Sequence, residues 1–198
     1  MIKATLSKEF KAKIKRTEKF KEMTKELGMG IMKFHALEII RIFHDGIQSD
    51  AFNLKRLEPE SVEAKKRQDF SLPEVPLYGN GDEAPKETSY SNMLRIRPAK
   101  GGYNIHASDG YHWSKRMKLS DLFTMHEMGK KIVLKNGTII NIPKRPALRM
   151  AYELYKKRVE SPKKTFQRLE ADYINNGKGL SEIKKYIKIY KQKGRHDE

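Results

Sequence analysis

The adjacent pair His126-Glu127 has the side chains that most directly suggest chemistry, because histidine and glutamate bind metals and exchange protons. A zinc-protease helix carries a second histidine four residues after the first, so that both imidazoles reach the metal from one helix face. Lys130 occupies that position here, which excludes this type of metal site. The other histidines have no metal-ligand spacing and are expected to be structural: His35, His44, His106, His112 and His196.

The other catalytic patterns are also incomplete. Asp109, between two histidines, lies in a Ser-Asp-Gly turn, where its carboxylate is expected to accept hydrogen bonds from nearby backbone. No serine lies in a nucleophile elbow, and Gly79-Asn80-Gly81 lacks the lysine and helix of a phosphate-binding loop. We therefore expect no enzymatic activity, no metal and no cofactor. A nuclease stays open as an alternative, because paired carboxylates for magnesium need no fixed spacing.

The composition predicts one basic domain with extensions. The chain has 198 residues, of which 37% are hydrophobic and 34% charged, and its formal net charge is +17. Such a charge either solvates exposed faces or binds a polyanion, and the composition leaves both alternatives open. The chain has no cysteine, which excludes disulfides and thiolate metal sites. No apolar run reaches bilayer length and no signal peptide is recognisable, so we expect a soluble intracellular protein without membrane contact.

A long N-terminal helix is the first predicted element. Apolar residues recur every three or four positions from about residue 8 to residue 44, which lines one helical face. Gly28 and Gly30 are expected to mark a kink or break, since glycine weakens a helix interior. Asp45-Gly46 is expected to end the helix.

Two hairpins are predicted after a long irregular segment, residues 47–89, in which Pro59 is expected to begin a short helix reaching about Gln68. Alternation of apolar and polar residues indicates antiparallel strands. The second hairpin turns at Asn136-Gly137, a favoured turn because both residues tolerate positive φ. The four predicted strands are residues 93–97, 103–107, 132–134 and 138–142.

Helices are predicted again toward the C-terminus, beginning at Pro146, at Ser161-Pro162 and at Ser181. This order of elements predicts the α+β class, with the long N-terminal helix and a C-terminal helix packed on a small antiparallel sheet. We expect one α+β domain over residues 1–160 and a basic helical extension over residues 161–198. The last helix is expected to dock on this domain or on a partner subunit, with an anionic surface, membrane or nucleic acid, as the alternative.

A nucleic-acid hypothesis follows from basic residues close to aromatic ones in the first hairpin. Interleaved cations and rings on a sheet can neutralise phosphate and stack bases. The same alternation also places arginines on the solvated face of any half-buried strand, so both alternatives stay open. The candidate contacts are Arg95, Arg97 and Lys100, near Tyr103, Tyr111 and Trp113.

Two segments resemble a family of virus assembly proteins. Leu122–Gly129, followed by Ile142-Pro143-Lys144-Arg145-Pro146-Ala147-Leu148, resembles the pattern "His-Glu-aromatic-Gly … Ile-Pro-Ala-Arg-Pro-Phe-Leu". That pattern is typical of tail-completion and minor tail proteins of tailed bacteriophages, the head–tail joining or neck family, to which the phage Mu virion-morphogenesis protein is similar. Upstream, Leu57–Ser61 and Pro76–Gly81 resemble the family's "Leu-x-Pro-x-Ser/Thr … Pro-Leu-x-x-x-Gly" segment. The resemblance covers about residues 5–160, with Met128 and Ala147 replacing the family's aromatic residues.

The resemblance implies a structural virion protein that forms a homo-oligomeric ring, hexameric or dodecameric, at the head–tail junction. It would be assembled in the host bacterial cytoplasm and would join tail to connector. The implied partners are the portal and adaptor connector proteins, the tail-tube and terminator proteins, and passing genomic DNA through non-specific contact. The residues implied at subunit interfaces are His126, Glu127, Gly129, Pro143, Arg145 and Pro146. The alternative function is a phage-encoded, basic nucleic-acid-binding protein without catalytic activity.

The paired prolines around Arg145 give this segment a physical role. Pro143 and Pro146 fix φ on both sides of the arginine, which ends a strand and sets the direction of the next helix. Arg145 is therefore expected to lie on a stiff support and to bind a carboxylate, with Glu127 the candidate partner in the same or a neighbouring subunit. Plain solvation of Arg145 is the alternative.

Overall fold

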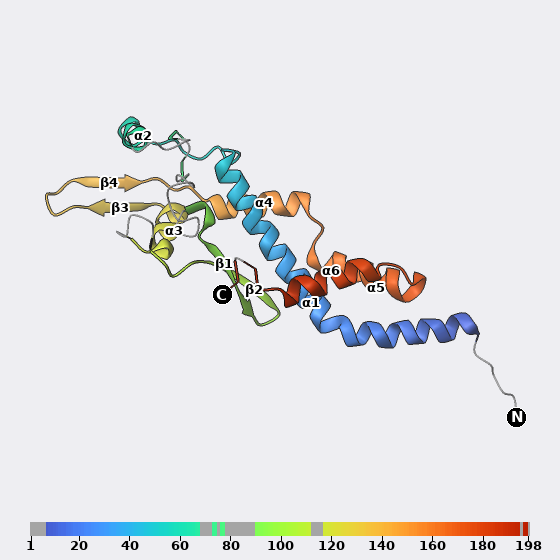
Figure 1. Ribbon diagram of the computed structural model, residues 1–198. Helices are drawn as coiled ribbons and strands as arrows, with labels where there is room; N and C mark the ends of the chain where they lie inside the picture. The colour runs from blue at the N-terminus through green and yellow to red at the C-terminus, as the bar shows by residue number, and fades with distance from the viewer. Residues whose placement is uncertain are drawn as a thin grey trace, which may run out of the picture. The chain divides into compact units, whose positions relative to one another are not determined.

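The computed structural model describes residues 7–67, 73–74, 76–77, 90–111, 117–194 and 196–197. Helices and two small antiparallel ribbons make it an α+β protein with a long N-terminal helix and a C-terminal helix, as the sequence predicts (Figure 1). The predicted end of the short helix, Gln68, lies outside the described residues. So do residues 78–89 and residues 112–116, which include Trp113. The elements are α1 (Lys8–Gln48), α2 (Pro59–Lys66), the 3₁₀ turn η2 (Tyr90–Asn92), β1 (Leu94–Ala99), β2 (Gly102–Ala107), α3 (Leu119–Met128), β3 (Lys130–Val133), β4 (Ile139–Ile142), α4 (Ala147–Arg158), α5 (Pro162–Asn176) and α6 (Leu180–Lys191).

The chain divides into two compact units. The helical unit comprises Met1–Ala36, Pro98–Tyr103 and Val159–Arg195, and the mixed unit comprises Leu37–Arg97, Asn104–Arg158 and His196–Glu198. The helical segment beyond residue 160 thus belongs to the same unit as the first half of α1. Among the described residues, no helix has the length and apolar character needed to cross a membrane.

The core of the helical unit lies between the first half of α1 and the two C-terminal helices. Ring contacts join α1 to both helices: Phe20 meets Phe166 of α5 edge-on at 5.7 Å, and Phe34 meets Tyr186 of α6 at 5.4 Å between ring centroids. The apolar faces of α5 and α6 are therefore used inside the unit. The buried core residues are Phe20, Leu27, Ile31, Leu169, Tyr173, Ile183 and Tyr186.

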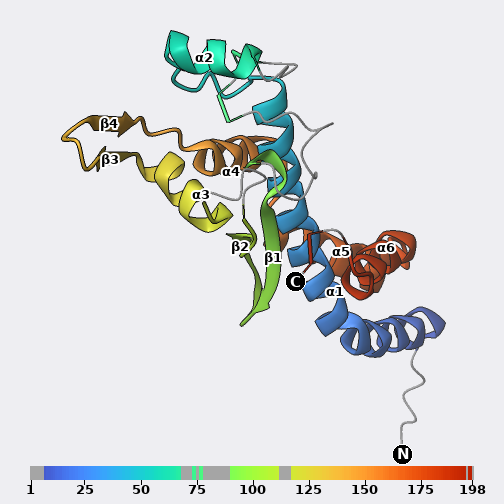
Figure 2. The same ribbon diagram turned by 60° about the vertical axis from the view of Figure 1, so that its left-hand side comes forward.

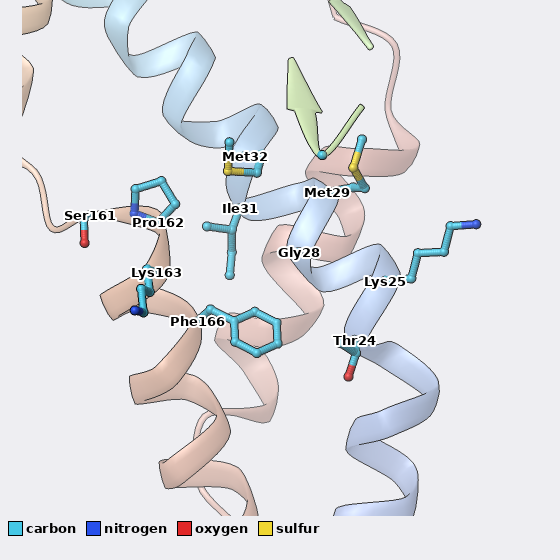
Figure 3. A pocket seen from close by; sticks show the side chains of 11 residues that line it. Thr24, Lys25, Gly28, Met29, Ile31, Met32, Ser161, Pro162, Lys163 and Phe166 are labelled. Carbon is cyan, nitrogen blue, oxygen red and sulfur yellow. The ribbon is translucent and has the colours of Figure 1, made fainter. Parts of the chain in front are cut away.

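The three glycines of α1 do not break the helix, which continues through Gly28, Gly30 and Gly46 to Gln48, and the last two have packing roles. A Cβ at Gly30 would lie 2.1 Å from the carbonyl oxygen of Tyr186, so the missing side chain lets the α6 backbone approach closely. A Cβ at Gly28 would meet no atom within 4 Å. The axis of α1 changes direction close to this residue (Figure 3). At Gly46 a Cβ would overlap the ring of Phe52, which explains a glycine here without a helix end.

The last two helices begin and end largely as their sequence indicates. The side chain of Ser161 accepts a hydrogen bond from the backbone N–H of Lys164, and Pro162 occupies the first turn of α5. Gly177 ends α5 in the left-handed conformation, with its N–H donating to the carbonyl of Tyr173. The N-cap of α6 is Gly179, so the prediction that Ser181 caps this helix is wrong.

The strands of the mixed unit pair as two separate ribbons, β1–β2 and β3–β4, where the sequence predicts one sheet. The outer edge of β1 is occupied by the end of the chain. The N–H of Ile96 donates to the carbonyl of His196 at 2.7 Å, and Ile96 forms a parallel bridge with Asp197. This edge is therefore not open to β3 or β4.

The β3–β4 ribbon has a tight register that sets which residues share a face. Ile132 lies opposite Ile140, and Val133 opposite Ile139. The turn differs from the expected one, because only Gly137 has a positive φ, 80°. The N–H of Gly137 donates to the carbonyl of Leu134, and the N–H of Leu134 donates to the carbonyl of Thr138. This pattern is that of a three-residue hairpin loop with a left-handed glycine.

Two glycine substitutions in α1 test the crossing of α1 and α6. Gly30→Ala is expected to lower the free energy of unfolding by about 1–3 kcal/mol, because its Cβ overlaps the Tyr186 backbone. Gly28→Ala is the matched control and is expected to raise it by up to about 1 kcal/mol, since alanine favours the helix and nothing obstructs its Cβ. Urea denaturation followed by circular dichroism measures both. Equal effects of the two substitutions would contradict the close approach at Gly30.

Candidate functional site

Gly129 makes the sharp junction between α3 and β3. Its φ is 76°, a backbone conformation that L side chains rarely adopt. A Cβ there would also lie 3.1 Å from the backbone nitrogen of Lys144 and 3.3 Å from the carbonyl oxygen of Ile142. The two strands of the ribbon therefore meet at their base with no space for a side chain, and this position requires glycine.

Glu127 stabilises the beginning of α4. Its Oε1 accepts a hydrogen bond of 2.9 Å from the backbone N–H of Leu148, in the first turn of that helix. Burial raises the pKa of this carboxyl group, and hydrogen bonds from the backbone of Leu148, Arg149 and Ala147 oppose the rise. A carboxylate at a helix N-terminus satisfies unpaired N–H groups and interacts favourably with the helix dipole. Glu127 thus connects α3 to α4.

Arg145 is buried, with 5% of its surface exposed, in the turn between β4 and α4. Its Nε donates to the carbonyl of Lys55 at 2.9 Å and its Nη2 to the carbonyl of Arg56 at 3.4 Å. Its backbone N–H donates to the carbonyl of His126 at 2.6 Å. Arg145 therefore joins three segments: the chain after α1, the end of α3 and the beginning of α4.

Two predictions about Arg145 are wrong within the subunit. The guanidinium donates to backbone carbonyls and not to Glu127, whose Oε1 accepts from α4. Solvation, the alternative, is excluded by its burial. The reason is geometric: Pro143 and Pro146 direct the chain so that Arg145 points toward the segment after α1, while Glu127 lies beside the helix it caps. Burial lowers the pKa of Arg145, and electrostatic interactions with Tyr90 and Glu58 oppose this.

His126 packs as a ring and not as a ligand. Its imidazole meets the ring of Tyr90 edge-on, with centroids 5.3 Å apart, and its Nδ1 is buried with no hydrogen-bond partner in the described structure. Burial lowers its pKa to about 4, helped by the positive charges of Arg145 and Lys65. The imidazole is therefore neutral at pH 7. Among the described residues, no group of three or more His, Asp or Glu side chains is placed to hold a metal ion.

Tyr90 is the centre of an aromatic cluster that the sequence did not indicate. Its ring stacks on Phe123 at 6.4 Å and lies 6.0 Å from Phe43 of α1. Burial raises the pKa of its hydroxyl, which is buried without a hydrogen-bond partner among the described residues. This cluster holds α3 against α1, behind the junction at Gly129.

The residues proposed to contact nucleic acid differ in their exposure to solvent. Arg95 is only 8% exposed, and its Nη1 donates to the carbonyls of Asn92 and Leu94, so it stabilises its own turn. The prediction of a solvated Arg95 is wrong, because β1 is buried on both faces from Leu94 to Ile96. Arg97 and Lys100 are exposed, and Tyr111 is 54% exposed.

Each unit contains a hollow that described residues line. In the mixed unit a hollow of about 720 Å³ lies beside α3 and the base of the ribbon. It is lined by three methionines with polar neighbours: Tyr111, Met117, Lys118, Asp121, Thr124, Met125, Met128, Gly129 and Lys130. In the helical unit an apolar hollow of about 630 Å³ lies between α1 and the beginning of α5, where Met29, Met32 and Phe166 surround it (Figure 3).

Together these contacts form a rigid corner, defined here as α3, Gly129, the base of the β3–β4 ribbon, Arg145 and the first turn of α4. It brings together His126, Glu127, Gly129, Pro143, Arg145 and Pro146, the six residues singled out in the sequence. Sequence reasoning missed α3 as a helix, although Leu119, Leu122, Phe123 and His126 have helical spacing before Gly129. Comparison of the chain with protein-family models, with curated proteins and with solved structures gives no match.

Replacement of His126 tests its buried neutral state. Between about pH 6.5 and pH 4 the unfolded chain carries a proton on His126 that the folded protein lacks. The free energy of unfolding should therefore fall as pH drops through this range. His126→Phe keeps a ring against Tyr90 and is expected to flatten this dependence by up to about 3 kcal/mol. Denaturant titrations at several pH values measure it, and an unchanged slope in the variant would contradict the assignment.

Replacement of Arg145 tests the clamp at the corner. Arg145→Lys keeps the charge, but one ammonium cannot reproduce the planar donors that reach both carbonyls, so a loss of about 2 kcal/mol in unfolding free energy is expected. Arg149→Lys, on an exposed position of α4, is the control and should change stability by less than about 0.5 kcal/mol. Thermal denaturation of both variants shows whether the buried hydrogen bonds of Arg145 contribute to the stability of the folded protein.

Proposed function

We propose that the protein is a non-catalytic assembly protein that forms a homo-oligomeric ring through its β3–β4 ribbon. The observation that carries this proposal is a ribbon with apolar side chains exposed on both faces, held in a fixed direction by the corner. Figures 1 and 2 both show this ribbon extending away from α3 and α4. Isolated two-stranded ribbons are marginally stable in water, so a partner for its faces is expected.

The register of the ribbon gives the exposed surface on each face. One face carries Ile132, Leu134, Ile140 and Ile142, and Leu134 and Ile140 are 42% and 43% exposed. The other face carries Val133 and Ile139, which are 64% and 51% exposed. Clustered exposed aliphatic residues on a soluble protein indicate an interaction surface. In the part of the chain that the structure describes, no third strand pairs with this ribbon, so both outer strand edges have backbone groups available for pairing with another strand.

The methionine-lined hollow beside α3 is a suitable receptor for the ribbon of a second copy. It lies at the base of the ribbon, and its rim includes Met128, which is 69% exposed. Methionine adapts its shape to apolar side chains and is common at interaction surfaces. A contact between the ribbon of one copy and the hollow of the next joins two different surfaces. Such heterologous contacts close into a ring when the rotation between subunits permits it.

We further propose a place for this ring, at the head–tail junction of a tailed bacteriophage. What supports it is the order of elements and motifs: a long helix, a β-ribbon, His126-Glu127 before Gly129, a second ribbon, and Arg145 between two prolines before a helix. These features resemble the neck and tail-completion family. In that role the corner fixes how one subunit meets the next, and the partners are connector and tail proteins.

The ribbon proposal predicts a difference between two matched substitutions. Ile140→Lys places a charge on the exposed ribbon and should shift the protein to monomers, whereas Ile14→Lys, on the first turns of α1, should leave the oligomer intact. The two isoleucines are 43% and 40% exposed, so both variants should fold. Native mass spectrometry and analytical ultracentrifugation measure the oligomeric state, and circular dichroism confirms the fold.

Two results would contradict the ring proposal. One is that the purified wild-type protein stays monomeric at high micromolar concentration and that native mass spectra of virions also show it as a monomer. The other is an oligomer that Ile140→Lys and Ile14→Lys affect equally, which would place the interface elsewhere.

A further inference from the structure

The positive charge of the chain is concentrated in one of its two units. The helical unit contains 21 Lys and Arg residues and 8 Asp and Glu residues, a net charge of +13. The mixed unit contains 21 basic and 17 acidic residues, a net charge of +4. The smaller unit therefore carries most of the formal charge of +17. The excess of positive charge therefore belongs mainly to the helical unit.

The first turns of α1 carry a stripe of lysines. Lys8, Lys11, Lys15 and Lys19 recur every three or four residues, so they lie along one side of the helix over about 16 Å. All are exposed, and every residue from 8 to 15 is exposed, so these turns extend beyond the core (dark blue in Figure 1).

The lysine stripe destabilises the first turns of α1. Lysines four residues apart on one face repel each other, as at Lys11, Lys15 and Lys19. Lysine near a helix N-terminus also opposes the helix dipole, and Glu9 is the single acidic residue of the first turn. Among the described residues, every residue from 8 to 15 is exposed, and contact with α5 begins at Arg16, which donates to the carbonyls of Ile174 and Asn175. A sequence that violates local rules without an internal gain indicates a functional surface.

A second set of lysines lies on the outer side of α6. Lys184 and Lys188 are exposed, while Ile183 and Tyr186 on the same helix are buried in the core. In the described part of the helical unit the ion pairs are Arg168–Glu182, Arg168–Glu160 and Lys191–Glu26. The α1 stripe, Lys184 and Lys188 have no carboxylate within ion-pair distance among these residues. Their charge is therefore available to an external anion.

The chemistry of this surface favours nucleic acid over a lipid membrane. An amphipathic helix binds a membrane by burying a wide apolar face in the lipid, but the apolar faces of α5 and α6 are already buried in the helical unit. Between residues 8 and 19 of α1 the large apolar side chains are Phe10 and Ile14 alone, which is too narrow a face for that mode of binding. Lysines act as point charges toward phosphate and carry no base recognition here. Rows of lysine on helices match the regular negative charge of a duplex backbone.

We infer that the helical unit is a sequence-independent binding surface for double-stranded DNA, formed by the lysine stripe of α1 and the exposed lysines of α6. The contacts are to backbone phosphates. This inference does not depend on the ring proposal, because it concerns the unit that lacks the β3–β4 ribbon. It assigns the two units different partners: DNA for the helical unit and a second copy of the chain for the mixed unit.

Fluorescence anisotropy with full-length protein and a labelled 30-base-pair duplex, in rising NaCl, tests the inference. Lys11→Gln/Lys15→Gln/Lys19→Gln should reduce the slope of log K against log salt by about 2.7 and weaken binding at 0.1 M NaCl by about tenfold or more. Lys184→Gln/Lys188→Gln should reduce the slope by about 1.8. Two duplexes of unrelated sequence should bind within about threefold of each other. The α1 variant should unfold at the same or a higher temperature, because lysine repulsion is removed.

The matched control removes three cations from exposed positions of α4 in the mixed unit, Arg149→Gln/Lys157→Gln/Arg158→Gln. It makes the same change in net charge and should leave the slope unchanged. Equal weakening by the control and the α1 variant would overturn the inference, since binding would then follow net charge alone. Wild-type protein that binds vesicles of phosphatidylserine and phosphatidylcholine more tightly than the duplex would also overturn it. The Ile140→Lys variant should still bind the duplex, which separates this result from failure of the ring.

Discussion

The buried guanidinium of Arg145 is the contact on which the mixed unit depends. A charge taken out of water must be compensated by hydrogen bonds. Here the acceptors are the carbonyls of Lys55 and Arg56, far away in sequence. The arginine therefore forces the chain that follows α1 to lie against the corner. Because its own N–H also bonds to the end of α3, one residue fixes the base of the ribbon and the beginning of α4 together. The direction of the ribbon follows from this clamp.

The elements with strong local signals were predictable from the sequence. The apolar stripe of α1, the hairpin at Asn136-Gly137, and the start of α5 at Ser161-Pro162 all depend on neighbours a few residues apart. The importance of Arg145 was also visible, because prolines on both sides restrict its backbone. The proline pattern could not show which acceptor the guanidinium reaches. The carbonyls of Lys55 and Arg56 carry no sequence signal, since every residue has a carbonyl group.

The errors have the same physical origin, which is tertiary packing. Alternation in β1 suggested a solvated Arg95, but both faces of that strand are covered. One four-stranded sheet was the natural expectation, yet the end of the chain occupies the outer edge of β1. Gly28 and Gly30 in α1 suggested a kink or a break, but the helix is not broken, and Gly30 permits the close approach of α6. The last two outcomes depend on residues 101 and 156 positions away in the chain, Asp197 for Ile96 and Tyr186 for Gly30, which no local pattern contains.

The shared core of α1, α5 and α6 has a consequence for synthesis of the protein. Phe20, Leu27 and Ile31 leave the ribosome early, while their partners Leu169, Tyr173 and Ile183 follow roughly 140 residues later. At ordinary rates of translation this interval is on the order of 10 s. Throughout it, the apolar face of α1 has no permanent cover, and the dense lysines on its other side keep the nascent helix soluble. The core of the helical unit is thus completed late, shortly before His196 and Asp197 can reach β1.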